Sequence, residues 1–145
     1  MKKMIILLLL PLILGVTACK KDKDEPAPQA VSFTLTEATL NGQVLSPLPA
    51  YTLTLHWDAA GVPTMYEAVN THPSAPAPGA VGSWTQNGTQ LTFTSQDGSK
   101  SHQVQVSGTQ VSALSSQIEV GYSMGKLDIP WPQVGDYTYT FERSQ

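Results

Sequence analysis

The stretch AVGSWTQNGTQLTFTSQDG, residues 80–98, decides the fold class of this chain. Polar and apolar residues alternate across 90–95, and a period of two is typical of a half-buried β-strand. A second strand is predicted just before it, over 80–86. Asn87-Gly88 joins the two strands and Asp97-Gly98 follows them, and both dipeptides tolerate the positive φ angles of hairpin turns. The stretch therefore predicts antiparallel strands joined by tight turns.

The same alternation recurs on both sides of this stretch. It appears over 31–36 and over 51–57, where Tyr51, Leu53, Leu55 and Trp57 fall on one face. Further strands are predicted over 64–70, 101–107, 117–123 and 136–143. No segment of useful length has helical periodicity. About eight strands with short turns predict an all-β fold, an antiparallel meander closed into a barrel or, alternatively, a β-sandwich. Closure into a barrel would leave no exposed strand edge.

Several of these segments are similar to the lipocalin-like domains of small bacterial lipoproteins. They are Gly82-Ser83-Trp84-Thr85, Gly88–Thr94, Asp97-Gly98, Leu53–Leu55 with the Asp58–Gly61 turn, and the closing segment Tyr137–Arg143. The resemblance covers about residues 50–143 and implies a calyx-like β-barrel with an unknown ligand or none. We carry over no binding residue, because lipocalins have Gly-x-Trp near their first strand and this chain has it in mid-domain.

The N-terminus has the features of an export signal. Lys2 and Lys3 precede an apolar run over 4–14, and small residues follow. Val16-Thr17-Ala18-Cys19 resembles the lipobox of bacterial lipoproteins, which implies cleavage before Cys19 and a diacylglycerol on its thiol. A transmembrane helix needs about 20 apolar residues, more than this run contains. We therefore expect residues 1–18 to be a signal peptide and Cys19 to be the lipidation site.

Residues 19–30 are expected to tether the lipid to the domain. Six consecutive charged residues, KKDKDE at 20–25, precede PAPQA at 26–30, and this composition is typical of a solvated, extended linker. The charged segment also resembles export signals of surface lipoproteins in some Gram-negative bacteria. Lys20 stands where an aspartate typically retains lipoproteins at the inner membrane. The resemblance implies anchoring in the outer membrane through the N-terminal lipid, with the domain on the cell surface or facing the periplasm.

Residues 31–145 are enough for one small domain and too few for two. Three basic residues stand against eight acidic ones in this range, a formal net charge of −5. Because basic residues are so few and form no cluster, nucleic acid is not an expected partner. Cys19 is the only cysteine, so a lipidated chain would have neither a disulfide nor a thiolate nucleophile.

The sequence offers few groups for catalysis. His56, His72 and His102 are far apart, lack metal-ligand spacing, and are each expected to face solvent. Glu37 and Glu67 give no sign of forming a catalytic pair. We expect no nucleophile elbow, although Gly121-Tyr122-Ser123-Met124-Gly125 has the Gly-x-Ser-x-Gly spacing, and no Gly-rich phosphate loop. We therefore expect a protein that is not an enzyme and that needs no metal or cofactor.

The three tryptophans are the candidate ligand contacts. Trp57 and Trp84 fall on inward-facing positions, where core packing is the alternative role. Trp131 lies between Pro130 and Pro132, which exclude a central strand, so it either caps the barrel or stacks on a ligand at its mouth. The Pro-rich segment 71–80 is expected to be a semi-rigid surface loop, most simply a tolerated insertion and alternatively a lid or a partner contact. The expected function is binding of a small apolar or saccharide ligand, or alternatively of an envelope protein, as an accessory subunit or adhesin.

Overall fold

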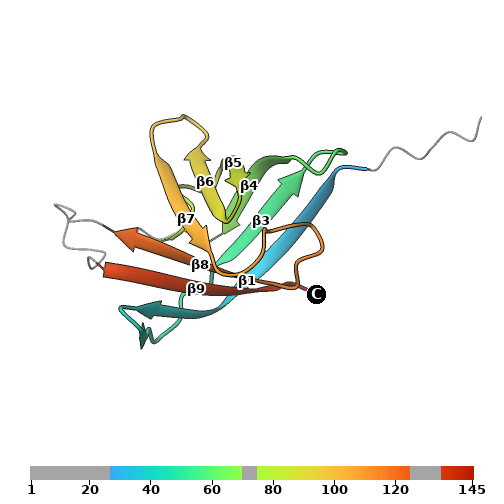
Figure 1. Cartoon of the computed structure of the whole chain (residues 1–145). Helices are drawn as coiled ribbons and strands as arrows, with labels where there is room; N and C mark the ends of the chain where they lie inside the picture. The colour runs from blue at the N-terminus through green and yellow to red at the C-terminus, as the bar shows by residue number, and fades with distance from the viewer. Residues whose placement is uncertain (1–26, 70–74, 125–134) are drawn as a thin grey trace, which may run out of the picture.

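The computed structural model describes residues 27–69, 75–124 and 135–145. Every helix or strand assigned in these ranges is a β-strand, as the alternating patterns predict (Figure 1). The strands are β1 (Gln29–Leu40), β2 (Gln43–Val44), β3 (Thr52–Trp57), β4 (Pro63–Val69), β5 (Val81–Asn87), β6 (Gln90–Ser95), β7 (Ser101–Val106), β8 (Gln117–Met124) and β9 (Gly135–Arg143). Cys19, His72 and Trp131 lie outside the described residues.

The strands form one antiparallel meander that closes on itself. Their order is β2-β1-β3-β4-β5-β6-β7-β8-β9, and β9 pairs back with β1. All strands except the two-residue β2 therefore belong to a closed barrel, and β2 is an extra strand beside the end of β1. The all-β, eight-stranded antiparallel barrel predicted from the sequence is confirmed, and the alternative of a β-sandwich is wrong.

β1 closes the barrel because it is long enough to pair with two strands. Its residues 29–34 pair with β3, and its residues 33–40 pair with β9. The register with β9 shifts between Leu35 and Glu37, where Thr36 and Glu37 are both exposed. This β-bulge bends the strand and restores the inward direction of Ala38 and Leu40 after it.

Two predicted hairpin turns are present, and a third was not predicted. Gly88 and Gly98 have φ angles of 61° and 70°, as expected for Asn-Gly and Asp-Gly turns. Asn41 and Gly42, with φ angles of 50° and 80°, form a further turn that joins β1 to β2. β2 was not predicted from the sequence, although Asn41-Gly42 carries the same signal as Asn87-Gly88.

Inward-facing side chains fill the barrel. Large side chains that are less than 2% exposed include Trp84, Tyr51, Tyr66, Tyr139, Phe33, Phe93 and Phe141. Ring centroids lie 5.2 Å apart between Trp57 and Trp84 and 5.3 Å apart between Tyr66 and Phe93, both edge to face. Aromatic quadrupoles favour this arrangement. The interior that the structure describes is therefore a packed core of protein side chains.

The barrel has two ends that differ in their loops. We call the end where β1 begins and β9 finishes the proximal end; it carries the β3–β4 turn (58–62) and the β7–β8 loop (107–116) (Figure 1). The opposite, distal end carries the β1–β2 turn, the segment 75–80 and the β6–β7 turn (96–100). Because different loops form the two ends, each end is considered separately as a candidate binding site.

Gly82 in β5 has no room for a side chain. A Cβ atom there would lie 2.0 Å from the carbonyl oxygen of Thr94 and 2.6 Å from Cε1 of Tyr66. We predict that Gly82→Ala lowers the free energy of unfolding by about 1–3 kcal/mol in a denaturant titration, because overpacking displaces the backbone or the ring. Gly121→Ala is the matched strand control, since the nearest atom to its Cβ would be 3.8 Å away. Equal losses in both variants would contradict this account.

Candidate functional site

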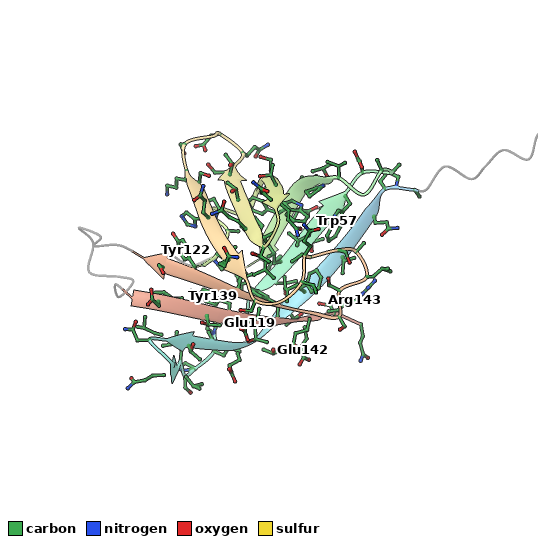
Figure 2. The ribbon with its side chains drawn as sticks, viewed as in Figure 1. Trp57, Glu119, Tyr122, Tyr139, Glu142 and Arg143 are labelled. Carbon is green, nitrogen blue, oxygen red and sulfur yellow. The ribbon has the colours of Figure 1, made fainter. Side chains whose placement is uncertain are left out.

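The structure describes two of the three candidate tryptophans, and both lie in the core. Trp84 is 1% exposed, and its indole N–H donates to the carbonyl oxygen of His56 at 3.1 Å. Trp57 is 4% exposed and packs edge to face on Trp84. Trp84 therefore acts as a core side chain, whereas Trp57, at the end of β3, also lines a hollow at the proximal end (Figure 2).

That hollow has a volume of about 500 Å³ and lies between the β3–β4 turn and the β7–β8 loop. Its apolar lining comes from Trp57, Ala59, Ala60, Val111, Ala113 and Leu114, and its polar lining includes Gln29, Asp58, Gln110 and Ser112. An apolar surface with a few polar groups is typical of a small-molecule site. This hollow is a candidate binding site because it contains Trp57, one of the ligand contacts predicted from the sequence.

Both sides of the hollow are held by hydrogen bonds. Oδ1 of Asp58 accepts the backbone N–H groups of Ala60 and Val62, both at 2.9 Å, and this fixes the β3–β4 turn. In the β7–β8 loop, the N–H of Ser112 donates to Oγ of Ser115 at 3.0 Å. Nη1 of Arg143 donates to the carbonyl oxygen of Ala113 at 3.0 Å. Hydrogen bonds within the chain therefore fix both sides of the hollow.

The distal end is covered by part of the Pro-rich segment. Ala75, Pro76 and Ala77 are all buried, so the prediction of a surface loop over 71–80 is wrong for these residues. A backbone hydrogen bond of Ala77 reaches the Tyr51 hydroxyl, whose pKa is raised, chiefly by burial. The physical reason is that the backbone of this segment bonds to two inward-facing rings, Tyr51 and His102, which lie far from it in the sequence.

His102 is the second correction, because it faces the barrel interior. Its β7 position pairs with Phe93, whose side chain is fully buried. The imidazole stacks on Tyr122 of β8, with ring centroids 4.9 Å apart and planes 23° apart. It lies where β7 and β8 separate, since these strands pair only at Gln105 and Val106. In contrast, His56 faces outward as predicted, and its Nε2 lies 3.0 Å from Oε1 of Glu67.

Burial lowers the pKa of His102 below its ordinary value, and the charge of Lys100 acts in the same direction. Hydrogen bonding of the ring to the backbone of Pro76 and Ala75 works against this shift. Among the described residues, Nδ1 has no hydrogen-bond partner. The ring is therefore a half-buried imidazole beside the segment that covers the distal end.

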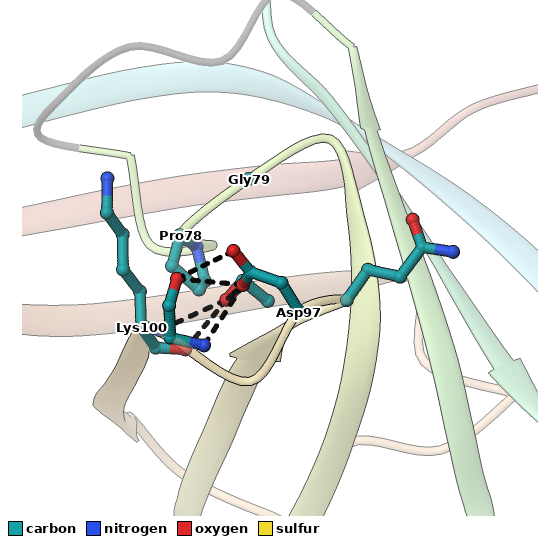
Figure 3. Close-up of a pocket in the computed structure, with 7 residues that line it drawn as sticks. Pro78, Gly79, Asp97 and Lys100 are labelled. Atoms are coloured by element: carbon teal, nitrogen blue, oxygen red, sulfur yellow. Dashed lines mark hydrogen bonds between the residues drawn. The ribbon is translucent and has the colours of Figure 1, made fainter.

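A second surface hollow, of about 470 Å³, surrounds Asp97 in the β6–β7 turn (Figure 3). Asp97 accepts hydrogen bonds from Oγ of Ser95 at 2.6 Å and from the backbone N–H of Ser99 at 3.0 Å. These bonds, with a further one from the Ser99 hydroxyl, lower the pKa of Asp97 to about 2. The carboxylate therefore stabilises its own turn.

The described ranges contain no group of three or more His, Cys, Asp and Glu side chains that would hold a metal ion. Those ranges also contain no helix with the length and apolar character needed to cross a bilayer. Neither finding adds a site to the two hollows and the His102 environment.

Comparison of the chain with models of known protein families, with curated proteins and with solved structures finds no match. No residue role is therefore transferred from a relative.

We predict that the fold loses stability in acid because of His102. Its pKa is lowered in the folded state, so the unfolded chain binds the proton more readily and stability falls as the pH drops below about 6.5. Above that pH the imidazole is neutral in both states and contributes no pH dependence. His102→Phe keeps a ring on Tyr122 but removes the titrating group. Its free energy of unfolding, from urea titrations at a series of pH values, should therefore fall less steeply below about pH 6.5.

The control for this prediction is His56→Gln, which removes an outward-facing histidine and leaves His102 in place. This variant should retain the part of the acid sensitivity that His102 causes. Identical pH profiles for the wild type and His102→Phe would contradict the prediction.

Proposed function

We propose that this protein is an outer-membrane lipoprotein, anchored by a lipid on Cys19, whose barrel is a non-enzymatic scaffold that binds an envelope protein. The packed interior is the observation that carries this proposal. Aromatic side chains occupy the barrel, Ala75–Ala77 cover its distal end, and Val111 is buried at the proximal end. Because side chains fill the barrel, we expect a partner to bind on its outer surface and not inside a calyx.

An apolar patch on the outer face supports a protein partner. Met65, Val69 and Val81 are 38%, 58% and 37% exposed. They lie on the adjacent strands β4 and β5, where Val81 is the register partner of Glu67, which stands between Met65 and Val69. Exposed apolar side chains that lie together, next to a charged residue, are typical of protein interaction sites.

A second candidate function is binding of a small apolar or saccharide ligand. The hollow beside Trp57 favours it, because this site combines an indole, small apolar side chains and several polar groups. Here the ligand would lie on the proximal end and not inside the barrel. The two functions differ in the molecule that remains associated with the protein when it is purified from its host.

The anchor is tested by metabolic fatty-acid labelling together with protease treatment of intact cells. Wild-type protein should be labelled, and Cys19→Ala should lose the label because the chain has no other cysteine. Removal of the domain from intact cells by protease would support a surface location. Protection with retained labelling would support the periplasmic side. Absence of label from the wild type would contradict the anchor.

The partner is tested with a photo-crosslinking amino acid at Val81 in intact cells. We expect a discrete protein adduct from this site, and none from the same probe at Gln103, an exposed outward-facing position on β7. Equal adducts at both sites, or none, would contradict the patch as a protein interface. Native mass spectrometry of the purified protein then tests the second function, because a bound small molecule without a crosslinked protein would favour the hollow.

A further inference from the structure

We propose that the proximal end of the barrel lies against the lipid bilayer, with Leu114 and Val62 in contact with lipid. This inference rests on the proposed lipid anchor. It adds an orientation to that anchor, because it assigns one end of the barrel to the membrane and leaves the distal end free for partners.

The first observation is the exposure of apolar side chains at this end. Leu114, in the β7–β8 loop, is 86% exposed, and Val62, in the β3–β4 turn, is 54% exposed. Ala60 is exposed beside them and lines the same hollow as Leu114. Apolar side chains on adjacent loops at one end of a soluble domain are a surface that lipid can cover.

The second observation is that the local backbone holds Leu114 outward. Its N–H donates to Oγ of Ser112 at 3.2 Å, and the N–H of Ser115 donates to the carbonyl oxygen of Ser112 at 3.0 Å. Arg143 holds the preceding residue, Ala113, by its carbonyl oxygen. The exposed leucine is therefore presented by a bonded loop that is linked to the end of β9.

The third observation is the distribution of charge. In the β3–β4 turn and the β7–β8 loop, Asp58 is the only charged residue, and its carboxylate is already bonded to two backbone N–H groups. Other acidic side chains lie at the distal end, as Asp97 and Asp136 do, or on the outer face of a strand, as Glu119 does on β8. Glu142, which pairs with the first residue of β8, is exposed next to the proximal end (Figure 2). Because burying an unpaired charge is costly, loops with so few charges are suited to a lipid surface.

The fourth observation is where the chain would leave the domain. β1 begins at Gln29 on the proximal end, and ten residue steps separate it from Cys19. A fully extended chain of this length spans at most about 35 Å. A lipid on Cys19 would keep the proximal end near the bilayer at high effective concentration, so weak apolar contacts would suffice to orient the barrel.

The test uses the full lipidated chain in phosphatidylcholine vesicles with bromine-labelled acyl chains. Cys19 would be blocked by its lipid, so a fluorophore attaches only to an introduced thiol. The fluorophore is placed at exposed Thr109, by Thr109→Cys in the β7–β8 loop, or at exposed Gln96, by Gln96→Cys on the distal end. We expect quenching at 109 and none at 96. It should persist in about 1 M salt, where screening removes charge attraction over distances beyond about 3 Å.

Leu114→Glu should abolish the quenching at 109. Val44→Glu is the matched control, because Val44 is also exposed and apolar, at 68%, but lies beside the distal β1–β2 turn. Flotation of the chain with the vesicles reports the anchor separately. A chain that does not float overturns the anchor and the inference together. A chain that floats with equal quenching at both sites, or with no effect of Leu114→Glu, overturns only the orientation.

Discussion

The pairing of one strand with both edges of the meander holds this barrel together. β1 is hydrogen-bonded to β3 along its first half and to β9 along its second half, and Phe33 and Thr34 belong to both registers. A β-bulge lies at Thr36 and Glu37, within the half that pairs with β9. Because side chains alternate along a strand, a regular β1 would direct Ala38 and Leu40 to solvent. The bulge therefore keeps the core face of β1 continuous along the half that pairs with β9.

The filled interior determines where binding can occur. Lipocalin-like motifs imply a cup for a ligand, whereas the residues described here place tryptophan, tyrosine and phenylalanine rings where a ligand would lie. What stays accessible is the outer wall over β4 and β5, the hollow beside Trp57, and the loops at the ends. These surfaces belong to different parts of the barrel. An anchored domain can therefore use one of them for the membrane and another for a partner.

The sequence was most informative where alternation was regular. Leu91 and Phe93, or Leu53 and Leu55, could be assigned to the core because their strands alternate without interruption. His102 was misjudged although the signal was present, since counting back from Val104 and Val106 places it on the inner face. Burial of Ala75–Ala77 had no such signal, because a Pro- and Ala-rich segment is typical of surface loops and only contacts distant in sequence bury it. Cys19 and Trp131 lie outside the described residues, so lipidation and ligand stacking remain predictions.

Pairing of the first long strand with the last one also affects how the chain folds. Phe33 finds its partner Arg143 more than a hundred positions later, so these contacts have a very large sequence separation. Chains dominated by distant contacts fold slowly, because a long loop must be closed before the pairing stabilises it. During synthesis from the N-terminus, β1 cannot pair with β9 until β9 has emerged from the ribosome. Until then its edge toward β9 is open to other chains, and a chain that ends before β9 has no closed barrel to form.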